Sequence, residues 1–385
     1  MKIAILGYGV VGSGAYEILT KSGFNVTRVL DLRPHDELGD VLTNDFDTIL
    51  NDKEISVVVE AIGGLEPAHT FLVKAIKAGK HVVSSNKHVI CTFFNELHTL
   101  ANEYGVTLRY TASVGGGIPW LHNLSRFVRC DNVTKICGIM NGTTNFILDS
   151  MIEESRDFDD VLREAQALGY AEADPSADID GFDTARKTAI SASIAFSTEV
   201  SESNVDIFSM RNIKKCDIEY IKDELGMLVR YLGTAIKCGN RVSAYVEPTI
   251  IPKTSMFAGV HKNNNMITLV GDYIGELSFV GQGAGKYPTG LAVANDVVDI
   301  IQGSGKKVAQ NVYAPQKYEV DNGAQMKQYY VRTKLGIKGD FVHSVRDDGQ
   351  YKYIITKQLS VSEIHRILDE ISDKDGEIFC AGIQW

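Results

Sequence analysis

The stretch best suited to proton-transfer chemistry is residues 170–187, YAEADPSADIDGFDTARK, which holds five carboxylates and ends on a lysine. It stands directly before an apolar run, TAISASIAF. Partial burial beside such a run shifts the pKa values of acids and amines, and proton-transfer groups need shifted pKa values. We therefore take this stretch as a candidate active site, with a solvated acidic loop as the plain alternative.

Lys187 is the residue that favours the active-site interpretation. If a helix opens at Asp183, Lys187 lies one turn later and shares a face with Ile190 and Ile194. Asp183 can then pair with the lysine at i, i+4 spacing. Burial and the positive end of the helix lower the pKa of a lysine, and nearby acids oppose that shift. Such a lysine can donate a proton to a developing alkoxide.

A glycine motif near the start of the chain is suited to a dinucleotide. Residues 7–12 read GYGVVG after an apolar segment, and Asp31 follows the next apolar segment. Glycines let the backbone approach a pyrophosphate, a helix N-terminus attracts it, and the acid can bind ribose hydroxyls. Asp31 favours NAD, whereas Arg28 or Arg33 could accept the 2′-phosphate of NADP. The candidate ligands here are Gly7, Gly9, Val10, Val11, Gly12 and Asp31.

Further candidates follow other predicted strands. Ile62, Gly63 and Gly64 end the segment SVVVEAIG, and Lys87 follows KHVVSS at the sheet edge where such folds bind ligands. Residues 113–119, SVGGGIP, and 141–145, NGTTN, are predicted loops rich in N–H and hydroxyl donors. Either loop could hold a small carboxylate or carbonyl, or could simply be a tight turn.

Strand and helix patterns alternate over the first 120 residues. This alternation predicts a parallel sheet covered on both faces, which is the outline of a nucleotide-binding domain. The predicted strands are 2–7, 25–31, 56–63, 80–85 and 106–114, and the predicted helices are 13–21 and 67–79.

The pattern changes near Phe127 to an α+β arrangement. Strands are predicted at 133–140 and 243–251 and helices at 157–169 and 218–236. A helix at 288–303, with Pro288 in its first turn, could pack back on the first domain. The last segment reads strand 329–337, strand 351–359, helix 360–372 and strand 377–385, a small sheet that needs to dock or dimerise.

These patterns predict an α/β protein with three parts. The first is a Rossmann dinucleotide-binding domain over residues 1–126 plus 287–307. The second is an α+β domain for substrate, catalysis and dimerisation over 127–286, and the third is a small α+β segment over 320–385.

Composition narrows the possible partners. A net charge of −10 without a long Lys/Arg run argues against nucleic acid, and no apolar run is long enough for a membrane helix. The six cysteines show no CxxC spacing, which favours reduced thiols in a cytoplasmic protein. We expect a small-molecule substrate.

Seven motifs in order over residues 1–305 make the chain resemble homoserine dehydrogenase: GYGVVGSG, VVEAIGGLEPA, SSNK, SVGGGIP, NGTTN, GYAEADPSADIDGFDTARK and GAGKYPT. The resemblance implies NAD- or NADP-dependent interconversion of L-aspartate 4-semialdehyde and L-homoserine, in the biosynthesis of threonine, methionine and isoleucine. Hydride attack on an aldehyde builds negative charge on oxygen, which an ammonium held by carboxylates can stabilise and protonate.

The resemblance also implies residue roles. Lys187 is implied as the proton donor or acceptor, Lys87 as its partner near the nicotinamide, and Asp178 as the residue at the reacting oxygen. Glu172 and Tyr170 would hold the substrate amino group and Gly142 and Thr143 its carboxylate, with Asp183 orienting Lys187. The residues implied to close over the cofactor are Gly283, Ala284 and Gly285.

Two departures from the family pattern stand out. Relatives with a monovalent cation, such as Na+, usually carry Glu where this chain has Thr111, which leaves the backbone carbonyls of Val114, Gly116 and Ile118 as possible ligands. Many relatives end in a threonine-sensing ACT domain. Here the terminal segment resembles a truncated one, with its first strand and last strand–helix–strand but without the helix and strand between.

Two alternatives and three questions stay open at this point. The chain could be another Rossmann oxidoreductase on a small amino-acid-derived aldehyde or alcohol, or a non-catalytic protein that senses the cofactor. The coenzyme, the effector and the oligomeric state are also open. A homodimer or higher homo-oligomer is our expectation, because short exposed strands need partners.

Overall fold

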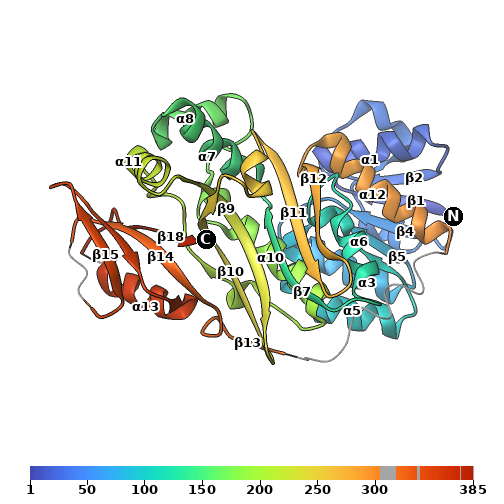
Figure 1. Cartoon of the computed structure of the whole chain (residues 1–385). Helices are drawn as coiled ribbons and strands as arrows, with labels where there is room; N and C mark the ends of the chain where they lie inside the picture. The colour runs from blue at the N-terminus through green and yellow to red at the C-terminus, as the bar shows by residue number, and fades with distance from the viewer. Residues whose placement is uncertain (304–317, 336–338, 373, 385) are drawn as a thin grey trace. The chain divides into compact units, whose positions relative to one another are not determined.

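The computed structural model describes residues 1–303, 318–335, 339–372 and 374–384 (Figure 1). The chain forms two compact units whose segments alternate along the sequence. Unit 1 contains residues 1–133, 190–201 and 281–317, and unit 2 contains 134–189, 202–280 and 318–385. The predicted three-part division stays a prediction, and its boundary at residue 307 lies outside the described residues.

Unit 1 is built on a six-stranded parallel sheet, as the alternating pattern predicts. The strand order is β3-β2-β1-β4-β5-β6, so the chain direction across the sheet reverses between β1 and β4. Ligands bind at such a switch point, beyond the carboxyl ends of the strands. The strands are β1 (Lys2–Leu6), β2 (Val26–Leu30), β3 (Leu42–Thr43), β4 (Ile55–Glu60), β5 (His81–Ser84) and β6 (Leu108–Arg109).

Helices α1 and α12 pack on one face of this sheet, over alternate residues of β1 and β4 such as Ile3 and Val57. A Cβ on Gly290 of α12 would lie 2.8 Å from the backbone N of Ala15 in α1, so only glycine permits the approach. The predicted return of this helix to the first domain is thus confirmed. The helices of unit 1 are α1 (Val10–Lys21), α2 (Phe46–Leu50), α3 (Ala68–Lys77), α4 (Lys87–Thr92), α5 (Phe94–Glu103), α6 (Trp120–Phe127) and α12 (Lys286–Ile301), with 3-10 turns at Asp36–Val41 and Thr111–Ser113.

Unit 2 is built on a twelve-stranded mixed sheet. Its main path runs β12-β11-β7-β9-β10-β18-β14-β16-β15, with β8 and β13 pairing β10 and β17 pairing β14. The strands are β7 (Val133–Ile139), β8 (Asp206–Ile207), β9 (Met227–Cys238), β10 (Arg241–Pro252), β11 (Asn264–Gly271), β12 (Gly275–Gln282), β13 (Glu319–Val320), β14 (Met326–Thr333), β15 (Val342–Asp347), β16 (Lys352–Thr356), β17 (Leu359–Ser360) and β18 (Phe379–Ile383).

Helices pack against this sheet. Helix α13 lies beside β14 (Figure 1). Its apolar residues pack in one core cluster with Tyr329 and Val331 of β14 and Tyr245 of β10. No helix in the described part of the chain is long and apolar enough to cross a membrane. The helices are α7 (Gly142–Glu154), α8 (Phe158–Ala167), α9 (Ser176–Ile179), α10 (Phe182–Phe196, in unit 2 up to Ala189), α11 (Lys215–Glu219) and α13 (Val361–Ser372), with short turns at Glu202–Asn204, Tyr220–Glu224 and Met256–Gly259.

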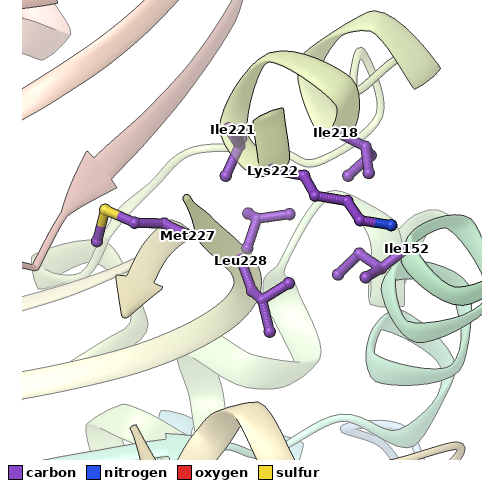
Figure 2. A pocket seen from close by; sticks show the side chains of 7 residues that line it. Ile152, Ile218, Ile221, Lys222, Met227 and Leu228 are labelled. Atoms are coloured by element: carbon purple, nitrogen blue, oxygen red, sulfur yellow. The ribbon is translucent and has the colours of Figure 1, made fainter. Parts of the chain in front are cut away.

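The predicted helix 218–236 is correct up to Glu224 and wrong beyond it. Helical turns end at Glu224, and β9 begins at Met227. Gly226 between them has φ +68°, a left-handed conformation that stops a helix at little cost for glycine. Figure 2 shows the junction, where Ile221 comes from the helical turn and Leu228 from the strand, around a hollow too narrow for a water molecule.

The C-terminal segment extends the large sheet. Its predicted helix and its strands β14, β16 and β18 are present, although the ends of predicted strands 329–337 and 377–385 lie outside the described residues. β18 pairs parallel with β10 and antiparallel with β14, so the expected docking occurs through backbone hydrogen bonds. The predicted lack of an intervening strand is wrong, because β15 is there. The strand order β18-β14-β16-β15 is that of a βαββαβ sheet, and the ACT resemblance stays a prediction.

Candidate functional site

The glycine loop of unit 1 is shaped for a close ligand. Helix α1 begins at Val10, three residues earlier than predicted, with Gly9 at its N-cap. A Cβ on Gly12 would lie 1.9 Å from the carbonyl oxygen of Gly7, so the loop closes only with glycine there. A Cβ on Gly9 would meet no protein atom within 4 Å, which leaves open space before the helix N-terminus. This arrangement fits the pyrophosphate of a dinucleotide.

Asp31 lies at the end of β2, where a ribose hydroxyl would be bound. Its carboxylate accepts hydrogen bonds from the backbone N–H groups of Tyr8 at 2.8 Å and Arg33 at 2.9 Å. The Arg33 guanidinium pairs with it at 3.2 Å and, with these bonds, holds the pKa of Asp31 well below its usual range. The two residues that favour NAD and NADP respectively therefore form one ion pair. The guanidinium of Arg28 donates to the backbone oxygens of Thr27 and Asp40.

Glu60 organises the edge of the sheet beyond β4 and β5, and the sequence reasoning missed it. This fully buried carboxylate accepts from the backbone N–H of Ile62 at 2.9 Å and that of Gly63 at 3.4 Å. It also accepts from the Ser84 hydroxyl and the Asn86 amide. One acid thus fixes both loops that carry predicted cofactor ligands, and its partners Ser84 and Asn86 are too distant in sequence for local patterns to indicate them.

Lys87 is the first residue of α4, three positions after β5 ends at Ser84. Asn86 caps this helix, because its side-chain oxygen accepts from the N–H groups of His88 and Val89. The amide of Asn86 also donates to the carbonyl of Gly64 at 2.7 Å. The backbone that carries Lys87 is therefore fixed at the carboxyl end of the sheet, as predicted. Its catalytic role stays a prediction.

Two glycine-rich segments of unit 1 lie against each other. A Cβ on Gly116 would lie 2.5 Å from the carbonyl of Gly283, and the N–H of Gly117 donates to the carbonyl of Gln282 at 3.2 Å. The loop predicted at 113–119 thus contacts the segment of Gly283, Ala284 and Gly285. Of the predicted cation ligands Val114, Gly116 and Ile118, the last has a carbonyl that already accepts from Trp120 N–H at 2.7 Å. A cation there stays a prediction.

In unit 2, Lys187 lies one turn into α10 and is buried, as the spacing predicts. Its Nζ donates to Asp183 Oδ2 at 2.7 Å and to the carbonyl of Met140, at the end of β7, at 2.7 Å. The ammonium is therefore held between an acid of its own helix and the carboxyl end of a strand. A buried amine held in this way is suited to proton transfer at a fixed position.

Asn141 joins the acids around Lys187, and the sequence reasoning did not assign it this role. Its Nδ2 donates to Asp178 Oδ1 at 2.7 Å and to Asp183 Oδ2 at 2.8 Å. Its Oδ1 accepts from Thr144 N–H and caps α7. The predicted loop 141–145 is therefore wrong, because residues 142–154 are helical and Asn141 is the N-cap that the sequence N-G-T-T could have indicated.

Asp178 lies in a site that disfavours its charge. Burial and the charge of Asp183 raise the pKa of Asp178, although the bonds from Asn141 and Thr143 and the charge of Lys187 oppose this. A carboxyl with a raised pKa beside a buried ammonium is typical of a functional site. The structure thus brings Asp178, Asp183 and Lys187 together.

The other predicted substrate ligands differ in their exposure and in the hydrogen bonds that they make. Gly142 and Thr143 form the first turn of α7, and the Thr143 hydroxyl donates to the backbone oxygen of Tyr170 at 2.6 Å. The Tyr170 side chain is exposed, and its ring contacts that of Phe146 at an angle of 59°. Glu172 is exposed, and its backbone oxygen accepts from Gln166. The role of the Glu172 carboxylate stays a prediction.

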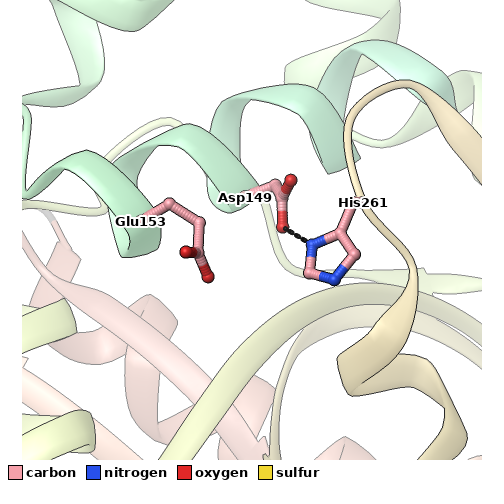
Figure 3. Close-up of side chains that lie close together, drawn as sticks. All are labelled: Asp149, Glu153 and His261. Atoms are coloured by element: carbon pink, nitrogen blue, oxygen red, sulfur yellow. Dashed lines mark hydrogen bonds and ion pairs between the residues drawn. The ribbon is translucent and has the colours of Figure 1, made fainter.

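A group of possible metal ligands, Asp149, Glu153 and His261, occurs elsewhere among the described residues (Figure 3). Both oxygens of Asp149 already accept bonds, Oδ1 from Arg230 and from His261 Nδ1, and Oδ2 from Lys262 N–H. The buried Arg230 cation next to Asp149 disfavours a second cation. We interpret this cluster as an ion-pair network.

Family models match most of the length of the chain. One described as "Homoserine dehydrogenase, NAD binding domain" matches residues 7–111, and one described as "Homoserine dehydrogenase" matches residues 119–298. The first therefore contains the glycine loop, Glu60 and Lys87, and the second contains Asn141, Asp178 and Lys187.

Curated relatives carry the same name. Homoserine dehydrogenase of Bacillus subtilis is 37% identical over 334 residues, which cover 83% of this chain and 77% of the relative. The Synechocystis enzyme is 40% identical, covering 78% and 73%. That of Corynebacterium glutamicum is 32% identical and covers 97% of this chain and 92% of its own length.

Solved structures agree. A homoserine dehydrogenase from Thiobacillus denitrificans is 30% identical, with a TM-score of 0.88 over 100% of this chain and 98% of that one. The S. aureus homoserine dehydrogenase at pH 8.5 is 29% identical, with a TM-score of 0.78 and the same coverage. The glycine loop and the lysine–carboxylate cluster thus occur on a fold shared over its whole length with these enzymes, and the chain belongs to the homoserine dehydrogenase family.

Proposed function

We propose that this chain catalyses the reversible NAD- or NADP-dependent reduction of L-aspartate 4-semialdehyde to L-homoserine. The observation that carries the proposal is the buried Lys187, bonded to Asp183 and lying beside Asp178 in the family motif. The bound coenzyme supplies or accepts the hydride. The reaction belongs to the biosynthesis of threonine, methionine and isoleucine.

Lys187 handles the proton in this proposal. As the aldehyde oxygen gains negative charge, the ammonium stabilises it and gives up a proton, and in the reverse direction the amine takes the proton from the alcohol. Asp183 and the carbonyl of Met140 hold Nζ in place during both steps. Asp178 binds the reacting end of the substrate, where its raised pKa favours hydrogen bonding without a second full negative charge.

The remaining groups bind substrate and coenzyme in this proposal. Glu172 and Tyr170 hold the substrate ammonium, and the backbone N–H groups of Gly142 and Thr143 hold its carboxylate at the N-terminus of α7. Lys87 acts near the nicotinamide. The proposed coenzyme ligands are Gly7, Gly9, Val10, Val11, Gly12, Asp31, Ile62, Gly63, Gly64, Gly283, Ala284 and Gly285.

The testing experiment is a coenzyme assay. Purified protein with L-homoserine and NAD or NADP is expected to produce reduced nicotinamide, seen by its absorbance, and the comparison of the two coenzymes sets the preference left open by Asp31 and Arg33. A panel of related small amino alcohols discriminates the alternative of another Rossmann oxidoreductase. Coenzyme binding without turnover of any alcohol would instead support a cofactor-sensing protein.

Assembly, location and regulation are part of the same proposal. A homodimer or higher homo-oligomer is expected, and sedimentation measures it. The six cysteines are thiols rather than disulfides, with Cys91, Cys137 and Cys380 buried, which favours a cytoplasmic location. An ACT-like role of residues 320–385 is tested by adding threonine to the coenzyme assay.

A further inference from the structure

Asp180 belongs to the acidic stretch and pairs with an arginine of the segment 209–211. Arg211 contacts it with two nitrogens, Nε to Oδ1 at 2.9 Å and Nη2 to Oδ2 at 2.6 Å. This two-point geometry fixes orientation as well as distance. The pair lowers the pKa of Asp180, so the carboxylate stays charged.

Residues 209–211 also hold the short helix α9, which directly precedes Asp180. Ser209 Oγ donates to the carbonyl of Ile179 at 3.1 Å and the N–H of Met210 donates to it at 3.1 Å. Arg211 Nη2 reaches Ser176 Oγ at 3.2 Å, at the start of α9. Residues 209–211 therefore contact both ends of this helix.

Helix α9 matters because it carries Asp178. Four residues are too few for a helix to be stable alone, so its position depends on contacts from outside. Asp178 Oδ1 in turn shares the Asn141 amide with Asp183, the partner of Lys187. A shift of α9 would thus move the carboxyl that we place at the reacting oxygen.

The contacting segment is itself anchored on the C-terminal strands. Asn212 Nδ2 donates to the carbonyls of Gly376 at 3.1 Å and Ile378 at 3.0 Å, and its own carbonyl accepts from Arg332 Nη2 at 2.6 Å. Arg332 is fully buried. The support of α9 therefore extends to residues outside both matched family regions, 7–111 and 119–298.

We propose that Arg211 is a positioning residue, which holds α9 through Asp180 and thereby places Asp178 for the reaction. The proposal rests on the proposed function. The pair is partly exposed, with 49% of the Arg211 side chain open to solvent, and exposed pairs contribute little to global stability. Its loss is therefore expected to change the site and leave the fold intact.

The test compares Arg211→Met, Asp180→Asn and their double variant with Arg163→Met. Arg163 is a matched control, because it lines the same 640 Å³ hollow and its exposed ion-pair partner, Asp160, belongs to its own helix α8. We expect kcat/KM for homoserine to fall about ten- to hundredfold in the first two variants, with coenzyme KM unchanged. The double variant should lose no more than the worse single one, because Arg211 acts through Asp180.

Two readouts separate positioning from a merely structural role. Release of α9 hydrates Asp178, so the acid limb of the kcat/KM profile should move to lower pH in Arg211→Met and stay in place in Arg163→Met. Amide exchange across residues 174–182 should rise in Arg211→Met and in Asp180→Asn but not in Arg163→Met, and this readout needs no turnover. Unchanged exchange, or turnover equal to that of Arg163→Met, overturns the positioning role. An inactive unaltered chain contradicts the proposed function instead.

Discussion

The same two residue types, a lysine and a carboxylate one helical turn apart, occur in unit 2 in opposite surroundings. Lys187 and Asp183 are buried, whereas Lys215 and Glu219 on α11 are about half exposed. Charges interact more strongly where water is excluded, and exposed pairs of this spacing contribute only a few tenths of a kcal/mol. Burial therefore decides which of the two lysines can do chemistry.

Substitution of Lys187 should stop turnover while leaving the coenzyme site intact. Lys187→Ala removes the proton donor, and we expect kcat to fall about 10²- to 10⁴-fold. Lys187→Arg keeps a positive charge that does not deprotonate. This variant should therefore be more stable than Lys187→Ala and still lose turnover. Coenzyme titration checks that the coenzyme site is intact, and the melting temperature reports the stability of each variant. Lys215→Ala is the control, and an active Lys187→Arg would contradict proton transfer by this residue.

Asp178→Asn should raise the stability of the protein near neutral pH while lowering its turnover. The folded-state pKa of Asp178 is raised by burial and by Asp183, so its stability contribution is present at low pH and lost as pH rises through that pKa. An amide does not ionise and avoids the loss. The melting temperature of the variant should match that of the unaltered chain in acid and exceed it near neutral pH.

Asp174→Asn is the matched control with the opposite sign. Bonds from Ser176 lower the pKa of Asp174, so its contribution is present above the unfolded pKa and lost as pH falls. This variant should be less stable near neutral pH and equal in acid. If both variants shift the melting temperature in the same direction, the assigned environments are wrong.

Local spacing was enough to predict the Asp183–Lys187 pair, because both residues belong to one helix. Asn141 and Glu60 were missed because their partners are far away in sequence, Asp183 at 42 positions and Ser84 at 24. No periodic pattern connects such residues. The structure thus joins Asp178 and Asp183 of the predicted acidic stretch to Lys187 through an amide that was not predicted, and the catalytic roles of these residues stay a prediction.

At the scale of elements, the glycine loop shows that two glycines of one motif serve different needs. Gly12 lets the chain pass close to the carbonyl oxygen of Gly7, whereas Gly9 leaves open space for a ligand. The sequence motif alone treats them alike. Gly226 shows the reverse, since this single glycine ended a helix that the apolar pattern of residues 218–236 had extended into β9.

The same substitution at the two positions should have different effects. Gly12→Ala places a methyl group 1.9 Å from the Gly7 oxygen and should destabilise the fold by about 1–3 kcal/mol. Gly9→Ala fits the backbone, with φ −75° and ψ −158°, and should keep the melting temperature while weakening coenzyme binding. Fluorescence titration with reduced coenzyme measures the second effect. Normal binding by Gly9→Ala would remove this loop from the coenzyme site.

At the scale of the whole molecule, the C-terminal strands are joined to α11 by a buried ion pair. Arg332 Nε donates to Asp217 Oδ1 at 2.8 Å, and neither side chain reaches solvent. The Tyr330 hydroxyl and the N–H of Lys214 complete the bonds to this carboxylate. The wider sheet was not predictable, because the β18–β10 pairing joins segments more than a hundred residues apart.

Arg332→Met should be strongly destabilising. It leaves Asp217 buried without its cation, and such losses cost about 3–5 kcal/mol. The pKa of Asp217, already raised by burial, should rise further. Arg332→Met combined with Asp217→Asn should recover part of the stability, as measured by urea unfolding. Arg346→Met, which breaks an exposed pair with Glu224, is the control and should cost at most about 1 kcal/mol.

The alternation of the two units along the chain has a consequence for biosynthesis. Strands β1 to β6 leave the ribosome well before α12, yet the apolar face over Ile3 and Val57 is covered partly by α12, which begins only at Lys286. Most of unit 2 is therefore synthesised while unit 1 still exposes that face. A nascent or truncated chain that stops before Lys286 carries an apolar sheet that is covered by α1 but not by α12, the kind of surface that chaperones bind and that drives aggregation.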